Sequence, residues 1–231
     1  MSAAAPETDV RQMFDRIAGR YDRANRVMSA GVDRWWRRKA MRLLLDGLGE
    51  APCVLDLGAG TLDGGIEILR RLPDARVFGA DFARNMLVEG KRKAGTRRIE
   101  AQVADGHCLP YRTAVFDAAW SSFCVRNLCD LPRAMAELRR VVRPGGRVAI
   151  LEFFRPRKKR AFFDGFYNAR VLPLIGRMVT GDAAAYRYLP ESIARFLGRS
   201  EFERLLVEVG FAKVSGRDLF PAGVASLVVA E

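Results

Sequence analysis

The segment Val54–Thr61, with the sequence VLDLGAGT, constrains the fold of this chain more than any other. Apolar residues flank a single acid, Asp56, and are followed by a turn of small residues and a helical pattern that begins at Asp63. This order predicts a buried parallel strand that leads into a glycine-bearing turn, where the backbone can approach a ligand closely. A turn of this kind without a ligand is the alternative, since short glycine patterns recur by accident.

A second apolar segment, Val77–Ala80, ends in the acid Asp81 about twenty residues after the glycine turn. An acid at the carboxyl end of the neighbouring strand is placed to accept hydrogen bonds from a ribose diol. We expect Phe82, the next residue, to contact the same ligand. Together the two segments predict a site for a nucleoside cofactor.

The spacing of the glycines favours one class of nucleoside cofactor. A dinucleotide turn has the order G-x-G-x-x-G, whereas here Gly58 and Gly60 are followed by Thr61, Leu62 and Asp63. An acid beside a pyrophosphate would cost Coulomb energy, but a cationic sulfonium or amino group would be stabilised there. The sequence therefore predicts S-adenosylmethionine, with Thr61 and Asp63 at its polar end. Thr61 is equally suited to cap the next helix.

Composition limits which partners, metal sites and cellular compartments can be expected for this chain. A chain of 231 residues with 49% hydrophobic content is long enough for one sizeable core, and its formal net charge of +12 predicts an anionic partner. The four cysteines lack C-x-x-C spacing and there is a single histidine, so we expect no metal site and a reducing compartment. No signal pattern opens the chain, and no apolar run approaches about eighteen residues. We therefore expect a cytoplasmic protein.

Strand-like and helix-like segments alternate along the chain, which predicts an α/β fold with a mostly parallel sheet covered on both faces. The expected strands are 53–57, 76–80, 99–103, 115–120, 147–152, 212–218 and 223–230, with helices at 63–71, 83–93, 131–142 and 200–209. We expect a single domain over residues 1–231. Its parts are a helical cap (1–49), a cofactor-binding core (50–152), a basic and aromatic helical insertion or lid (153–199), and the final helix and strands (200–231).

Several longer sequence words resemble those of the ubiquinone/menaquinone biosynthesis C-methyltransferases. They are MFDRIAGRYD at 13–22, SFCVRN at 122–127, LEF at 151–153, LPLIG at 172–176 and AYRYLPESI at 185–193. The resemblance implies a Rossmann-like class I methyltransferase with a seven-stranded sheet, a helical N-terminal extension and a helical insertion before the last two strands. It also implies transfer of a methyl group from S-adenosylmethionine, leaving S-adenosylhomocysteine, to a ring carbon of a prenylated hydroquinone such as a demethylmenaquinol or a related benzoquinol.

Three positions depart from the family pattern. Leu62 stands where the family usually has a glycine, Cys124 replaces the glycine of the SFGLRN word, and His107 replaces an acid. We interpret His107 as a loop residue rather than a base, because its neighbours are apolar or small. Cys124 is interpreted as a small filler, since no flanking feature predicts a lowered pKa for its thiol.

The family pattern places adenine contacts on Asp105 and Gly106, although a solvated loop acid is the alternative for Asp105. Ser122 ends the fourth predicted strand, at the edge of the sheet where ligands bind in such folds. Asp56 must be hydrogen-bonded or have a shifted pKa if it is buried. It either braces the turn beneath the cofactor or serves as structural support alone.

Three further residues are the predicted catalytic group. Methylation of a ring carbon requires an electron-rich ring, which a hydroquinone becomes when one hydroxyl ionises. Arg126 remains protonated in proteins, so it is suited to stabilise that phenolate; the alternative is a pair with an acid of the core. Asn127 would orient the other ring oxygen or a water that receives the displaced proton. Tyr21 would close over the pocket, or serve only as a core aromatic.

The segment 153–163 combines five positive charges with four phenylalanines. Such a run is usually a solvated face, but a prenylated substrate lies in a bilayer and basic side chains are attracted to anionic lipid. With the apolar residues of 172–179 it predicts an interfacial lid, hence a lipid-soluble quinol and an anionic membrane surface as partners, at the inner face of the cytoplasmic membrane. No nucleic-acid partner is expected; a homodimer or a biosynthetic complex is left open.

Two other functions were weighed. The charge of +12 also suits a methyltransferase that acts on RNA, or on another amphipathic small molecule, although the basic run lacks stacking aromatics on a sheet. The substitutions at Leu62 and Cys124 suggest instead a cofactor-binding scaffold without catalysis.

Overall fold

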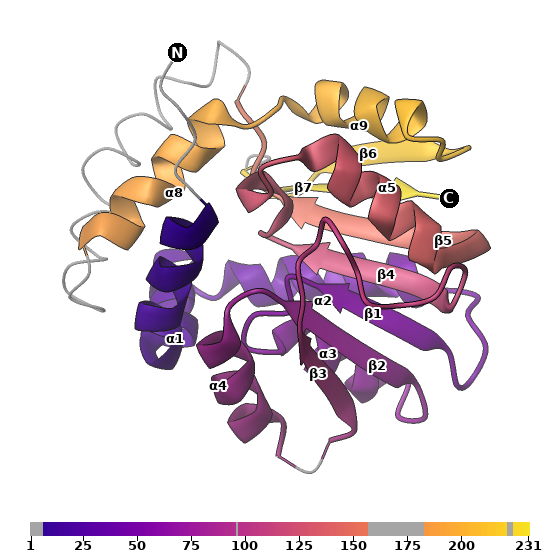
Figure 1. Cartoon of the computed structure of the whole chain (residues 1–231), viewed down its shortest axis with the longest axis horizontal. Helices are drawn as coiled ribbons and strands as arrows, with labels where there is room; N and C mark the ends of the chain where they lie inside the picture. The colour runs from indigo at the N-terminus through magenta and orange to yellow at the C-terminus, as the bar shows by residue number, and fades with distance from the viewer. Residues whose placement is uncertain (1–6, 96, 157–182, 221–223) are drawn as a thin grey trace.

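Seven strands form one sheet in the order β3-β2-β1-β4-β5-β7-β6 (Figure 1). The computed structural model describes residues 7–95, 97–156, 183–220 and 224–231. The first five strands are parallel, and β7 is antiparallel to both of its neighbours. The strands are β1 (Cys53–Leu57), β2 (Arg76–Asp81), β3 (Ile99–Val103), β4 (Phe116–Ser122), β5 (Val142–Glu152), β6 (Val214–Asp218) and β7 (Ser226–Ala230).

Helices cover both faces of this sheet, which confirms the predicted fold class. Among the described residues they are α1 (Glu7–Met28), α2 (Val32–Leu45), α3 (Asp63–Arg71), α4 (Arg84–Ala94), the 3-10 helix η1 (Val125–Asn127), α5 (Leu131–Val141), α8 (Ala183–Arg195) and α9 (Arg199–Glu208). Helices α2, α3 and α4 pack on one face, and α5 and α9 on the other. In Figure 1 the arrowheads of β4 and β5 point toward α1 and α8. The cap and the lid helix therefore lie beyond the carboxyl ends of the strands.

Alternating side chains of the central strands build the two halves of the core. In β1, Val54 belongs to the half under α2 and α3, and Leu55 to the half under α5 and α9. Both are fully buried, as is Trp120 in the adjacent strand β4. Complete burial of one such side chain stabilises the fold by about 1.5–3 kcal/mol. The two-sided burial explains why these strands are apolar almost throughout.

Leu62 adopts the left-handed conformation that a glycine usually supplies. Its φ is 61° and its ψ 22°, just before α3 begins. This conformation costs roughly 1–2 kcal/mol for a residue with a side chain. The Leu62 side chain is fully buried in the space left by two glycines, Gly79 of β2 and Gly90 of α4. Its burial offsets the strain, so the departure from the family pattern is accommodated by packing.

Strand β5 begins earlier than the predicted residue 147. Helix α5 ends at Val141, close to the expected boundary, and Val142 already pairs with Phe116. The next pair joins Ala118 to Arg147, so residues 143–146 bulge out of the register. Residues 143–146, with the sequence Arg-Pro-Gly-Gly, therefore lie within a strand that a proline and two glycines would disfavour.

Most of the predicted lid lies outside the described residues. These include Arg157, Lys158, Lys159, Arg160, Phe162, Phe163 and the apolar residues of 172–179. Within the part of the chain that is described, no helix is long and apolar enough to cross a bilayer.

The packing around Leu62 gives a test of stability. A methyl group at Gly90 would lie 2.6 Å from Leu62 Cγ and 2.8 Å from the Thr61 carbonyl carbon. Gly90→Ala should therefore lower the free energy of unfolding by about 1–3 kcal/mol, measured by urea denaturation. Gly19→Ala is the control, because Gly19 lies in α1 with nothing within 4 Å and should gain about 0.5–1 kcal/mol. Equal stability of the two variants would contradict this packing.

Candidate functional site

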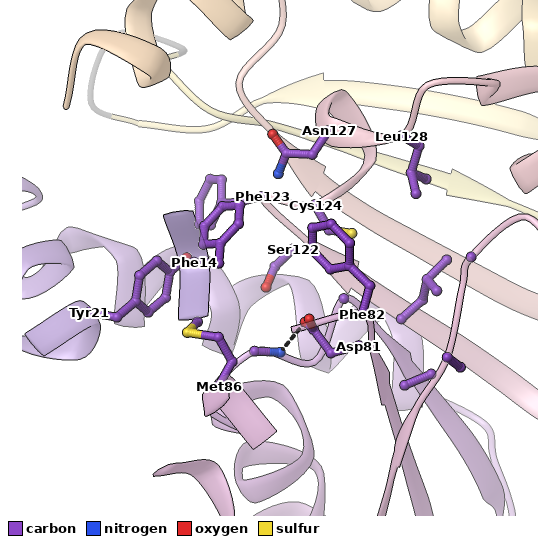
Figure 2. Close-up of a pocket in the computed structure, with 16 residues that line it drawn as sticks. Phe14, Tyr21, Asp81, Phe82, Met86, Ser122, Phe123, Cys124, Asn127 and Leu128 are labelled. Carbon is purple, nitrogen blue, oxygen red and sulfur yellow. Dashed lines mark hydrogen bonds between the residues drawn. The ribbon is translucent and has the colours of Figure 1, made fainter. Parts of the chain in front are cut away.

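A cavity opens at the edge of the sheet where β1, β2 and β4 end (Figure 2). It encloses about 620 Å³, part of which is open to solvent. The helix α1, the strand-end turns and η1 contribute its walls. The lining residues are Phe14, Tyr21, Leu57, Gly58, Gly60, Ala80, Asp81, Phe82, Met86, Ala104, Gly106, Ser122, Phe123, Cys124, Asn127 and Leu128.

Asp81, the last residue of β2, lies at one end of this cavity. One carboxylate oxygen accepts from the backbone N–H of Gly60 at 2.8 Å, and the other from that of Ala83 at 2.8 Å. Burial raises the pKa of Asp81 to about 6, against the effect of these hydrogen bonds. Each carboxylate oxygen retains a free lone pair, so Asp81 can still accept from two hydroxyls.

Asp56 lies beneath the glycine turn and outside the cavity lining. Its carboxylate accepts from the backbone N–H of Gly65, in the first turn of α3, at 2.9 Å. Burial raises the pKa of Asp56 to about 7. A methyl group on Gly64 would lie 2.6 Å from this carboxylate, so the helix approaches the strand closely. Asp56 therefore attaches α3 to β1 and supports the turn from below.

Thr61 and Asp63 lie in a charged network instead of the cavity lining. Lys93 of α4 donates to the Thr61 hydroxyl at 2.8 Å, to Asp63 at 2.7 Å and to Asp22 of α1 at 2.6 Å. Arg37 of α2 reaches the other oxygen of Asp63 at 3.0 Å. Although burial raises the pKa of Asp63, Arg37 and Lys93 lower it below its usual value. The network joins the N-terminal cap to the glycine turn.

The loop after β3 supplies another wall through Gly106. Asp105 is exposed and accepts from both the backbone N–H and the Nδ1 of His107, at 2.8 and 2.6 Å. The His107 Nε2 in turn accepts from the backbone N–H of Asp130 at 3.2 Å. Both ring nitrogens of His107 are therefore engaged, and the side chain joins the loop after β3 to the start of α5. His107 is a buried loop residue, in agreement with the sequence interpretation.

Arg126 lies next to the cavity and is paired with an acid. Its Nη1 lies 2.7 Å from Glu152, whose side chain is completely buried, and 2.8 Å from the carbonyl oxygen of Phe123. Its Nε donates to Ser192 of α8 at 3.3 Å. This is the pair with a core acid that the sequence left open as the alternative. The guanidinium also fixes the position of α8 over η1.

Asn127 and Tyr21 line the cavity, and Figure 2 shows Asn127 on the opposite side from Asp81. Tyr188 of α8 donates its hydroxyl to Asn127 Oδ1 at 2.9 Å, a contact that we did not predict. Burial raises the pKa of both tyrosines, while the charge of Arg126 lowers it. One phenol and one amide therefore meet at this end, and the Tyr21 phenol lies in the cavity wall. The only sequence feature that pointed to a functional role for Tyr188 was its position within the AYRYLPESI segment.

Cys124 closes the wall above the glycine turn. A Cβ on Gly58, whose φ is +68°, would lie 2.2 Å from the Cys124 sulfur. Gly58 is thus required by its backbone conformation and by this contact. Burial raises the pKa of the Cys124 thiol, which agrees with its interpretation as a filler.

The residues present fit S-adenosylmethionine. A Cβ on Gly60 would lie 3.3 Å from Met86, and one on Gly106 would lie 3.1 Å from Leu128, so these glycines leave room that other residues would fill. Asp81 supplies the acceptor for a ribose diol, and apolar side chains supply walls for a purine. Of the predicted cofactor contacts, the lining residues are Gly58, Gly60, Asp81, Phe82, Gly106 and Ser122, while Asp56, Thr61, Asp63 and Asp105 lie around the lining.

Solved structures with the same architecture support the class of this protein. The [4+2]-cyclase SpnF superposes with a TM-score of 0.71 at 17% identity, covering 99% of this chain and 97% of that one. A Haemonchus contortus phosphoethanolamine N-methyltransferase in complex with S-adenosyl-L-methionine gives a TM-score of 0.64 at 14% identity, covering 85% and 52%. At these identities the likeness establishes the fold alone. The fold is that of the class I S-adenosylmethionine-dependent methyltransferases.

Sequence comparisons identify the family. The model of the ubiE/COQ5 methyltransferase family matches residues 2–230. The demethylmenaquinone methyltransferase of Thermus thermophilus is 41% identical over 224 residues, 95% of this chain and 99% of that protein. The ubiquinone/menaquinone biosynthesis C-methyltransferase UbiE of Geobacter sulfurreducens is 39% identical over 230 residues, 96% and 88%. The chain belongs to the ubiE/COQ5 methyltransferase family and is an S-adenosylmethionine-dependent methyltransferase.

Asp81 gives a prediction for cofactor binding. Asp81→Asn should weaken S-adenosylmethionine binding by on the order of 1–3 kcal/mol in calorimetry, because an amide cannot accept from both hydroxyls and both backbone donors. Affinity of the parent should also fall as the pH drops below about 6, where Asp81 takes up a proton, and this decline should be absent from the variant. Asp56→Asn is the control at neutral pH, since Asp56 lies outside the lining. Unchanged affinity in a folded Asp81→Asn protein would refute the assignment.

Proposed function

We propose that this enzyme methylates a ring carbon of a prenylated hydroquinone, a demethylmenaquinol or a related benzoquinol, in respiratory quinone biosynthesis. The cavity carries the proposal because it has an acid suited to a ribose at one end, Asn127 with its partner Tyr188 at the other, and Tyr21 in its wall. Polar groups of this kind match the oxygens of a hydroquinone ring. Relatives named demethylmenaquinone methyltransferase and UbiE support the same substrate class.

When bound, S-adenosylmethionine supplies an electrophilic methyl group. Asp81 and the glycine turn would hold this cofactor at one end of the cavity, and the substrate ring would occupy the remaining space near Asn127. Phe14, Phe82 and Phe123 surround the space between the two ends and exclude water. Exclusion of water strengthens each electrostatic interaction within the site.

The ring would be positioned by the amide of Asn127 and the hydroxyls of Tyr21 and Tyr188. Burial raises the pKa of both tyrosines, so both are protonated at neutral pH. The Tyr188 hydroxyl already donates to Asn127 Oδ1, which leaves the amide N–H groups of Asn127 as donors to a ring oxygen. A donor is what a developing phenolate requires, because negative charge on oxygen makes the ring carbon nucleophilic. Asn127 would also orient the water that takes up the displaced ring proton, as the methyl group passes from the sulfonium sulfur to the ring carbon and S-adenosylhomocysteine is left.

Arg126 acts on this site through the electrostatic field of its positive charge and through its hydrogen bonds. Its charge lowers the pKa of Tyr21 and Tyr188, so it favours negative charge at the position that a ring oxygen would occupy. Its pairing with Glu152 reduces that field but fixes the guanidinium in one place. Through Ser192 the same group also holds α8, which carries Tyr188. We therefore infer that Arg126 stabilises the phenolate and positions the lid.

Variants of Arg126 and Glu152 separate catalysis from stability. Arg126→Met leaves the buried Glu152 unpaired, which should cost about 3–5 kcal/mol of stability. The double variant Arg126→Met/Glu152→Gln should recover much of that stability but not the rate, which should remain about a hundredfold below the parent. Arg126→Lys should keep partial activity. Parental turnover in the stable double variant would reduce Arg126 to a purely structural role.

A lipid-borne substrate requires the enzyme to meet the membrane at the inner face of the cytoplasmic membrane. Of the proposed lid segment, Phe154 is buried against Phe196 and Phe202, and Arg155 pairs with Glu201 at 2.6 Å. Phe154 is therefore part of the core, whereas Arg155 is exposed and stays a predicted contact for anionic lipid. The remainder of the basic run lies outside the described residues.

Lipid-quinone profiling tests the proposed function. A strain that lacks the gene should accumulate a quinone with one methyl group fewer than the mature quinone, and the parent gene should restore the mature form. The Asp81→Asn gene should restore it poorly, whereas the Gly19→Ala gene should restore it fully. An unchanged quinone profile in the deletion strain would overturn the assignment of substrate.

A further inference from the structure

The outer face of helix α2 carries a concentrated positive charge. Its five solvent-facing residues are four cations and one tryptophan: Arg34, Trp35, Arg38, Lys39 and Arg42. At 3.6 residues per turn they fall within an arc of about 140°. The opposite side of α2 is apolar and packs on β4 and β5. We refer to the five residues as the α2 outer face.

No acid neutralises this face within the part of the chain that the structure describes. Asp33 is the one acid in α2, and it turns inward to pair with Arg37 at 3.0 Å. Lys39 lies 5.0 Å from the centre of the Trp35 ring, and the other three cations of the face form no ion pair with a described residue. The charges are therefore available to an external anion.

Apolar side chains border the α2 outer face at the end nearest the cavity. Trp36 donates its Nε1–H to the carbonyl oxygen of Phe220 at 2.6 Å, which holds the segment after β6 against α2. The Phe220 side chain is 75% exposed, that of Val224 47% and that of Trp35 43%. Trp36 also packs against Phe123, which lines the cavity. The exposed apolar groups thus lie beside the wall of the substrate site.

We propose that the α2 outer face, with Phe220 and Val224, docks the enzyme on an anionic lipid surface. Cations attract the phospholipid head groups, while Trp35 and Phe220 enter the boundary between head groups and acyl chains. A nucleic acid fits less well, because Phe220 and Val224 place exposed apolar surface beside the cations, which a sugar-phosphate backbone would leave uncompensated. The surface deepens the proposed function, on which its biological purpose rests, since it brings the cavity edge to a substrate dissolved in the bilayer.

Trp35 reports directly on this contact. The chain has three tryptophans, and the other two, Trp36 and Trp120, are 4% and 0% exposed. Vesicles of equal parts phosphatidylglycerol and phosphatidylcholine should shift the emission of the parent to shorter wavelength. Brominated phosphatidylcholine in the same vesicles should quench it. Trp35→Phe should abolish both changes while its thermal unfolding remains that of the parent.

Neutral variants test the charges. Arg34→Gln/Arg38→Gln/Lys39→Gln/Arg42→Gln keeps good helix formers and should lower the vesicle partition coefficient several hundredfold at low salt, about fivefold for each charge. The matched control neutralises four exposed arginines elsewhere on the chain: Arg98, Arg112, Arg139 and Arg204. It should lose far less, because its charges lie away from the surface. High salt should reduce binding of the parent toward that of the α2 variant.

The outcomes separate this proposal from the proposed function. Equal partitioning of the α2 variant and the parent, unchanged Trp35 emission on vesicles, or preference of the parent for RNA over vesicles would each overturn the docking surface. Turnover of a short-tailed, water-soluble quinol should be equal in the α2 variant and the parent. Absence of that turnover in the parent would instead refute the substrate assignment, with vesicle binding unaffected.

Discussion

The carboxylate of Asp81 is the contact on which the rest of the site depends. By accepting from Gly60 and Ala83, it joins the turn after β1 to the turn after β2 and fixes the distance between them. Burial raises the pKa of Asp81 to about 6, so keeping this carboxylate ionised and away from water lowers the stability of the folded protein. A ribose diol would recover part of that cost by replacing the lost solvent. The same residue therefore shapes the floor of the cavity and selects its occupant.

Segments distant in the sequence meet over this floor through charges. Lys93 joins Asp22 of α1 to the glycine turn, and Arg126 joins Ser192 of α8 to η1. Helices α1 and α8 are thus attached by polar contacts in addition to a small apolar cluster of their own, which is separate from the core beneath the sheet. Such contacts are weakened when a partner is displaced or protonated, whereas the packing beneath the sheet is not. This difference suits elements that must admit and release a substrate.

Much of this fold could be predicted from the sequence, because parallel strands that are buried on both faces are apolar almost throughout. The apolar runs, the acid at position 81 and the glycine turn predicted the order of elements and the edge that carries the site. Contacts between two residues that are far apart in the sequence produce no such pattern. The hydrogen bond between Tyr188 and Asn127 and the pairing of Arg126 with Glu152 depend on how α8 and β5 approach η1 in space. Thr61 and Asp63 likewise look like ligand contacts until α1 and α4 are placed beside them.

The three departures from the family pattern are explained by local packing rather than by loss of the site. Leu62 fills the space beside Gly90, and Cys124 fills the space above Gly58. His107 replaces an acid but holds Asp105 through its ring and its backbone N–H. In each case the substituted side chain is in contact with the backbone of a turn that lines the cavity or with a residue next to it. These substitutions change the side chains that support the cavity walls, while Asp81, Asn127 and Tyr21 still face the cavity. For that reason no structural argument favours a cofactor-binding scaffold without catalysis.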